Sequence, residues 1–352
     1  MKLGVKITLI VVAAIAIAII IGVSIVAGIA GRVNDETVPV EALSAWQSAI
    51  KDETLLKNVA IPGSHDAGTD GMPWYSKTQS REIDDQLACG TRYFDLRIKV
   101  KNGEARIYHG PAVSLYLKDI LKDVSDFLTA HPSESVILDF QNFDKDDAKT
   151  KSLELIDEYL TGKIVVNDTQ KTDMEFIDAL TIGEIRGKCL IFWGKNDGIA
   201  QSDNRIFQRN DDTGSRTNAC MHSYYTQKWN WHYSSKKYID KALPAYINMY
   251  KQQGGGLFVL QGQLTDGMLI RGPRYREATH EKNMNDYVVL LSESEDLSYI
   301  NIVMRDFVSP MKNTYTLILN ISKGIVKDEC KSDYAAMISA TVTDYASVAN
   351  LS

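Results

Sequence analysis

The stretch "IPGSHDAGTD", residues 61–70, places a histidine and an aspartate side by side directly after an apolar run. Proline and glycine favour tight turns, so the run "LLKNVAIPG" is predicted to be a strand that ends in a sharp bend. Such a bend presents His65 at the rim of the fold and leaves Asp66 free to serve a different partner. An imidazole beside a carboxylate is typical of acid–base chemistry.

Further short runs, rich in Val, Ile, Leu and aromatic residues and bounded by turn residues, are typical of strands. Between them lie amphipathic stretches such as residues 114–132, whose apolar spacing predicts a helix that stops before Pro132. The alternation of strand and helix predicts a parallel α/β barrel or a doubly wound sheet. The predicted strands are "TRYFDLRIKV" (91–100), "ARIYHG" (105–110), "SVILDFQNF" (135–143), "KCLIFWG" (188–194), "GLFVLQGQL" (256–264) and "YINIVMRDF" (299–307).

Length and charge exclude some classes of protein. The chain has 352 residues, of which 44% are hydrophobic, so it can bury the core of one large barrel. Its formal net charge of −6 and the absence of a Lys/Arg cluster argue against a nucleic-acid surface. The four cysteines have no metal-like spacing. Cys89 and Cys189 lie within apolar runs, where we expect buried free thiols, and the sequence assigns no disulfide.

The N-terminus predicts a membrane segment. Residues 7–30 carry no charge and are long enough to cross a bilayer as a helix. We favour an uncleaved signal-anchor (residues 1–30) over a cleaved signal peptide, with Lys2 and Lys6 on the cytoplasmic side. Residues 31–45 are expected to be a stalk, and residues 46–352 the catalytic domain. The domain is then extracellular on the cell membrane, or secreted if the segment is cleaved.

Polar residues occur in or directly after the predicted strands. In a parallel barrel the carboxyl ends of all strands meet on one face, so these side chains converge into one pocket. A neutral imidazole could remove a proton from a hydroxyl, a protonated one could donate to a leaving oxygen, and a guanidinium could neutralise a phosphate. The set therefore predicts phosphoryl transfer without a metal. Its members are His65, Asp66, Asp95, Arg97, His109, Asn142 and Asp306.

Five ordered motifs, "IPGSHDAGT", "TRYFDLRI", "IYHGP", "HPSESVILDFQN" and "RGKCLIFWG", resemble the X-type catalytic domain of bacterial phosphatidylinositol-specific phospholipase C. The resemblance runs from about Leu55 to about Asp306. It implies a single distorted TIM (β/α)8-type barrel behind the N-terminal helix. It also implies attack of the inositol 2-hydroxyl on the adjacent phosphodiester, which releases diacylglycerol and a cyclic inositol phosphate. The partner would be a phosphatidylinositol-type lipid at a membrane surface, met by a monomer that needs no cofactor.

The resemblance also implies roles for individual residues. His65 corresponds to the general base, oriented by Asp306. His109 corresponds to the general acid, assisted by Asp66. Asp95 and Arg97 match the phosphate-site pair, in which the arginine takes the place of the calcium of animal relatives. The roles fall on His65, His109, Arg97, Asp66, Asp95 and Asp306.

The positions that bind the inositol hydroxyls depart from the family pattern. Where bacterial members carry a lysine after the third strand, this chain has Gln141, and their next basic residue falls on Gly194 or Lys195. Ser223 and Tyr225 stand where an aspartate and a tyrosine are expected. Catalysis is therefore better supported than the identity of the headgroup.

Two other functions were weighed, and the role of one segment has two interpretations. A metal-dependent glycerophosphodiesterase on the same barrel would need a carboxylate cluster, but Arg97 stands where such a site would want an acid. A catalytically inactive, membrane-tethered lipid or glycan binder predicts loss of one imidazole, and both are present. The segment "SYYTQKWNWHY" (223–233) is either a lip of the active site, stacking on a sugar or entering the lipid interface, or a loop packed on the barrel.

Overall fold

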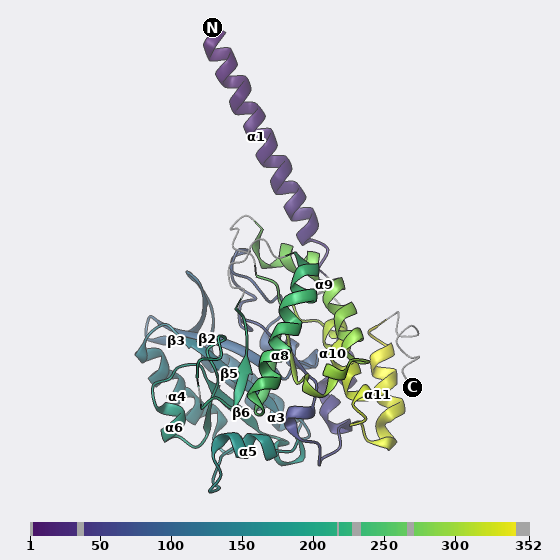
Figure 1. Cartoon of the computed structure of the whole chain (residues 1–352). Helices are drawn as coiled ribbons and strands as arrows, with labels where there is room; N and C mark the ends of the chain where they lie inside the picture. The colour runs from purple at the N-terminus through teal and green to yellow at the C-terminus, as the bar shows by residue number, and fades with distance from the viewer. Residues whose placement is uncertain (1–2, 34–38, 217, 227–233, 266–270, 343–352) are drawn as a thin grey trace.

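A computed structural model describes residues 3–33, 39–216, 218–226, 234–265 and 271–342. The first element is the helix α1 (Leu3–Ala30), which projects away from the rest of the molecule (Figure 1). Its 20 residues Val11–Ala30 have a mean hydropathy of 2.9, and none of that window is buried. By length and composition α1 could cross a membrane, and a signal sequence would meet the same criteria.

Eight parallel strands form a nearly closed barrel, so the doubly wound alternative is excluded. Their order around the barrel is β7-β6-β5-β2-β1-β10-β9-β8. An isolated parallel bridge between Arg209 and Met221 joins the two end strands, β7 and β8. The strands are β1 (Ile61–Ser64), β2 (Tyr93–Lys101), β5 (Val136–Phe143), β6 (Cys189–Trp193), β7 (Ile206–Gln208), β8 (Met221–Ser223), β9 (Leu257–Gln261) and β10 (Ile302–Arg305).

Helices surround the barrel, but they are unevenly distributed among its connections (Figure 1). The described part of the connection between β7 and β8 contains no helix, and only the short α2 follows β1. The α-helices are α2 (Ile83–Ala88), α3 (Leu117–Ala130), α4 (Asp146–Leu160), α5 (Asp173–Ala179), α6 (Ile199–Ser202), α7 (Ser235–Lys237), α8 (Leu243–Gln253), α9 (Gly272–Leu291), α10 (Pro310–Ser322) and α11 (Lys331–Ser339). A π-turn spans Tyr238–Ala242, and 3-10 turns span Glu41–Ala49, Leu56–Asn58, Gly183–Ile185, Glu295–Tyr299 and Asp328–Cys330.

Side chains along β2 point alternately to the apolar core that packs against α3 and to the barrel interior, where the site lies. Phe94, Leu96 and Ile98 are fully buried and pack in one apolar cluster with the inner face of α3. Tyr93 belongs to a second cluster, with residues of β1, β9 and β10. Because successive side chains point to opposite faces, Asp95 and Arg97 follow Tyr93 into the barrel interior.

The stretch "ARIYHG" is not a barrel strand, which corrects the sequence expectation. β3 (Glu104–His109) pairs antiparallel with β2 and with β4 (Ala112–Tyr116). Asn102 and Gly103 have φ of 55° and 78°, the left-handed conformation that a two-residue hairpin turn requires. His109 therefore reaches the barrel mouth from a hairpin that extends β2.

Two other segments differ from expectation. "LLKNVAIPG" contains a 3-10 turn at Leu56–Asn58, and only its end, with Ser64, forms β1. Packing begins inside the segment expected to be a stalk, because Leu43 is fully buried and the Trp46 indole donates to the Gly90 carbonyl at 2.9 Å. All four cysteines are unpaired thiols.

Candidate functional site

A cavity of about 500 Å³ opens at the carboxyl ends of the barrel strands. This is the end of a parallel barrel at which loops and strand ends converge. Asn142 lines the cavity, and so do eight of the ten residues given a catalytic or headgroup role from the sequence: His65, Asp66, Arg97, His109, Gln141, Lys195, Tyr225 and Asp306.

Asp66 lies at the centre of the polar groups. Its φ of 43° is left-handed, a conformation that aspartate tolerates better than most residues, and it turns the side chain back across the cavity. One carboxylate oxygen lies 2.6 Å from Arg97 Nε. The other lies 3.3 Å from Nε2 of His65 and 3.6 Å from Nε2 of His109. Asp66 thus faces both imidazoles, and the expectation that it points away from His65 was wrong.

His65 is held from its other side by Asp306. Nδ1 of the imidazole lies 2.7 Å from Asp306 Oδ1, and because a carboxylate accepts, Nδ1 carries the proton. Nε2 is then the atom that can exchange a proton in the cavity. Burial alone would lower the pKa of His65, but the charges of Asp66 and Asp306 outweigh it and raise the pKa to about 9.

His109 is oriented by a main-chain carbonyl. Its Nδ1 donates to the Ser76 oxygen at 2.8 Å, which leaves Nε2 towards Asp66. The two imidazoles come from different elements, one from the end of β1 and one from the β3–β4 hairpin that extends the neighbouring strand β2. Both therefore present Nε2 to the same carboxylate.

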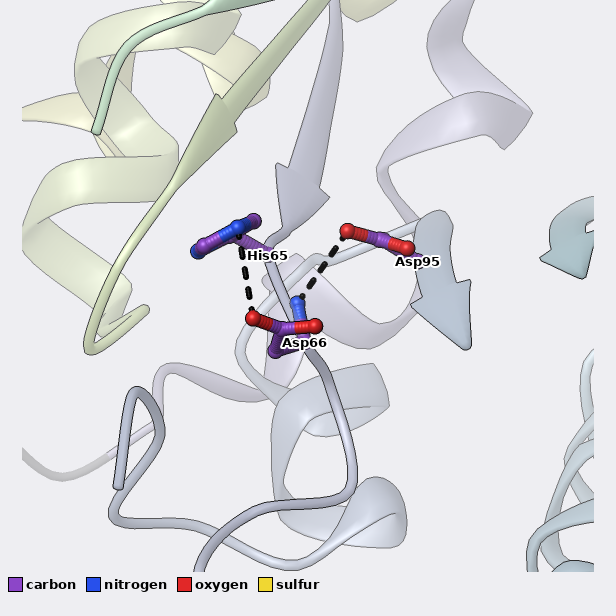
Figure 2. A group of neighbouring side chains, drawn as sticks. All are labelled: His65, Asp66 and Asp95. Carbon is purple, nitrogen blue, oxygen red and sulfur yellow. Dashed lines mark hydrogen bonds and ion pairs between the residues drawn. The ribbon is translucent and has the colours of Figure 1, made fainter. Parts of the chain in front are cut away.

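Asp95 lies behind Asp66 and does not line the cavity. It is fully buried, and its Oδ2 accepts the Asp66 amide at 3.4 Å (Figure 2). Burial and the neighbouring Asp66 charge raise the pKa of Asp95. Burial also opposes ionisation of Asp66, yet the charges of Arg97, His65 and His109 lower its pKa to about 2. Asp66 is therefore ionised, and Asp95 supports its backbone.

His65, Asp66 and Asp95 are of residue types that can bind a metal ion. Ligand atoms of His65, Asp66 and Asp95 all lie within 4.8 Å of one another. The Arg97 guanidinium, however, already contacts Asp66 and carries a fixed positive charge beside the same cavity. Calcium would need about six to eight oxygen ligands, more than these two carboxylates supply. The residues present fit a guanidinium-based phosphate site better than a cation site.

Only some of the residues expected to bind the headgroup line the cavity. Gln141, Lys195 and Tyr225 reach the cavity, and the Tyr225 hydroxyl accepts the Thr265 amide at 3.1 Å. Ser223 lies outside the lining: it is fully buried, and its hydroxyl contacts Gln261 Nε2 at 2.5 Å. The structure thus does not bring Ser223 to the site.

Gly194 explains why Lys195 is the residue presented at the end of β6. A Cβ on Gly194 would lie 1.8 Å from the carbonyl oxygen of Gln141, so no other residue fits without moving the backbone. The close approach brings the end of β6 against the end of β5, and the next side chain, Lys195, lines the cavity.

Sequence reasoning missed two arginines. Arg209 follows β7 and lies between two acids, with Nε 3.2 Å from Asp139 and Nη2 2.8 Å from Asp212. Arg216 lines the cavity from the connection that leads to β8. Strand β7 has three residues, too few for a periodic pattern, so no local signal marks either arginine.

Aromatic residues also border the cavity. Tyr75 is in its lining, and Trp74 beside it is 57% exposed. In the aromatic segment 223–233, Tyr224 and Tyr225 are buried. The rest of that segment, residues 227–233, lies outside the described residues.

The chain is similar in sequence and in fold to known proteins of one kind. Residues 54–195 match the family model described as phosphatidylinositol-specific phospholipase C, X domain. A 1-phosphatidylinositol phosphodiesterase of Staphylococcus aureus (strain Newman) is 26% identical over 227 residues, 58% of this chain and 68% of that protein. One of the same name from Listeria monocytogenes is 32% identical over 157 residues, 42% of this chain and 47% of that protein, so the match spans about half of its length.

Solved structures extend the likeness to most of the chain. The phosphatidylinositol-specific phospholipase C of Listeria monocytogenes superposes with a TM-score of 0.57 at 21% identity, covering 79% of this chain and 98% of its own. A Staphylococcus aureus enzyme with pentafluoro-Phe incorporated gives 0.59 at 18% identity, covering 80% and 97%. At these identities the superpositions establish the fold, which is that of the bacterial enzymes' barrel. Residues 54–195, which run from β1 to β6, are thus the part of this chain whose sequence matches the X domain of the phosphatidylinositol-specific phospholipase C family.

Proposed function

We propose that the protein cleaves the phosphodiester of phosphatidylinositol-type lipids by attack of the inositol 2-hydroxyl, without a metal. The products are diacylglycerol and a cyclic inositol phosphate. The observation that carries the proposal is the pair of imidazoles, whose Nε2 atoms lie 3.3 and 3.6 Å from one oxygen of Asp66, with Arg97 on the other oxygen.

Each residue has one task in the reaction. His65 Nε2 takes the proton of the 2-hydroxyl as that oxygen forms its bond to phosphorus, and Asp306 holds the resulting imidazolium. The bond from phosphorus to the glycerol oxygen breaks, and His109 donates a proton to that oxygen. Arg97 donates hydrogen bonds to the phosphate oxygens as their charge grows, which is the work that a metal ion would otherwise do.

The raised pKa of His65 has a consequence for the pH dependence. At neutral pH the imidazole of the empty site is mostly protonated, because its pKa is about 9. A base must be neutral, so turnover should increase with pH across the range in which His65 loses its proton. The acidic limb of the pH–rate profile should therefore lie above the value of a free imidazole.

We also propose that the protein acts while α1 anchors it in the membrane. Arg274, near the start of α9, donates from Nε to the carbonyl of Ala30, the last residue of α1, at 3.2 Å. The first residues of α9, Gly272 and Pro273, line the cavity. α1 thus meets the domain beside the cavity mouth, which suits an enzyme tethered to its own membrane.

All of the proposed catalytic groups come from one chain, which suits a monomer. Its catalytic domain is residues 46–352 together with the turn that precedes them.

Replacing either imidazole should abolish the reaction. We expect His65→Ala and His109→Ala each to lower turnover by about a hundredfold to ten-thousandfold, the usual contribution of acid–base groups. Turnover is measured by phosphorus NMR of the products formed from phosphatidylinositol vesicles. The expected product of the parent protein is cyclic inositol phosphate. His131→Ala, at the end of α3 and outside the cavity lining, is the matched control. Near-parent turnover in either site variant removes that residue from its role.

Removing the Asp306 charge should change the pH profile. Asp306 raises the pKa of His65, so Asp306→Asn should lower that pKa and move the acidic limb to lower pH. The rate at the optimum should fall as well, because the ring loses a charged partner. Glu154→Gln, on the exposed face of α4, serves as the control. A profile and rate both identical to the parent's would contradict the pairing.

If α1 stays attached, the full-length protein should remain in the membrane fraction after carbonate extraction, because a helix this apolar does not leave the bilayer. Fractionation of the producing cells, followed by N-terminal sequencing, measures this. Recovery of a soluble form that begins near Gly31 would show a cleaved signal instead.

A further inference from the structure

Lys312, on α10, has a completely buried side chain that does not line the catalytic cavity. An ammonium group has three protons to donate, and this one has an acceptor for each. The Glu277 carboxylate lies 2.8 Å from Nζ, and the main-chain carbonyls of Phe307 and Asp306 accept at 2.8 and 3.2 Å. The ammonium thus binds the turn that carries Asp306, the residue that lies against His65.

The turn after β10 has a conformation that needs support. Phe307 has a φ of 48°, in the left-handed region that bulky side chains rarely adopt. Such a conformation persists only where the surrounding groups fix it. The Phe307 amide donates to the Thr78 carbonyl at 2.7 Å. The next amide, that of Val308, donates to Gln79 Oε1 at 2.9 Å. Lys312 donates to the two carbonyls of the same turn, so buried groups bind both its amides and its carbonyls.

Glu277, on α9, fixes the position of the ammonium. Its Oε1 also accepts Arg305 Nη2 at 3.3 Å. Arg305, the last residue of β10, points towards α9, because its Nη1 donates to Asn285 Oδ1 at 3.0 Å. Successive residues of an extended chain point to opposite faces, so Asp306 is directed into the barrel. Burial alone would raise the pKa of Glu277, but the charges of Lys312 and Arg305 outweigh it and lower the pKa.

A buried ion pair of this kind is weak evidence for stability, because the cost of taking two charges out of water is comparable to their attraction. An apolar side chain could fill the same space, so the charge needs another reason. We propose that Lys312 is a positioning residue for the reaction: held by Glu277, it fixes the turn of Asp306 so that this carboxylate stays aligned with Nδ1 of His65. The inference rests on the proposed function, in which Asp306 holds His65 as the imidazole takes the proton.

The test separates kcat from KM and uses the full-length protein with monomeric dihexanoyl phosphatidylinositol. Lys312→Met keeps most of the side-chain volume and removes the ammonium. We expect kcat to fall by about tenfold to a hundredfold, as for a misplacement of about 1 Å. KM should change little, because Arg97 and the rest of the phosphate site are untouched. In an Asp306→Ala background the same substitution should lower kcat by less than about threefold, because no carboxylate is left to position.

Two further variants complete the experiment. Lys323→Met is the matched control: its ammonium also donates to a main-chain carbonyl, that of Ile300, but this bond lies at the amino end of β10, away from the site. Its kcat should equal the parent's. Glu277→Gln keeps the shape of the side chain but removes the charge that holds the ammonium, so it should lower kcat in the same way and by less. Thermal unfolding of each variant shows whether it is folded.

The outcomes distinguish this inference from the function on which it rests. A parent that cleaves no inositol lipid defeats the proposed function itself. A folded Lys312→Met with the parent's kcat overturns the positioning role alone. An equal loss of kcat with Asp306 present and with Asp306→Ala also overturns it, because a general structural fault would act in both backgrounds. If neither Lys312→Met nor Glu277→Gln folds, the pair is required for folding, and that result too overturns the assignment.

Discussion

The carboxylate of Asp66 is the group on which the site depends. Its left-handed backbone, directly after β1, turns the side chain across the barrel mouth towards Arg97. The same carboxylate holds the Nε2 atoms of His65 and His109 towards one point. Because β1 and β2 are neighbours in the barrel, this contact needs no long loop and can be rigid. The close packing of two imidazoles and a guanidinium around one acid is what gives the cavity its chemistry.

Such a concentration of charge is costly to bury unless every charge has a partner. The barrel meets this condition by alternating acids and bases across its mouth. Arg97 neutralises Asp66, Asp306 lies against His65, and Arg209 lies between Asp139 and Asp212. Burial raises the pKa of Asp139 to about 7 despite the Arg209 charge, so Asp139 is partly protonated at neutral pH.

Much of the site could be predicted because its residues lie on strands with strong local patterns. "TRYFDLRI" alternates clearly, so Asp95 and Arg97 fall on the inner face, and the family motifs point to His65, His109 and Asp306. What could not be predicted depends on tertiary structure. The φ of Asp66, for example, decides which way its side chain points. The hairpin that carries His109 is a different case, because the Asn102-Gly103 turn is a local signal that the sequence analysis overlooked. The three-residue strands β7 and β8 have no periodicity, which is why Arg209 and Arg216 were missed and Ser223 was placed in the cavity.

The central claim is that a fixed guanidinium, held by Asp66, does the work of a metal ion. Its most direct test is turnover of phosphatidylinositol in excess EDTA, with and without added calcium, for the parent and Arg97→Lys. We predict that the parent is unaffected by either addition. Arg97→Lys should lose most of its activity, because a point charge cannot reproduce the two directional hydrogen bonds of the planar fork. A parent that is inactive in EDTA and recovers with calcium, or a fully active Arg97→Lys, would contradict the account.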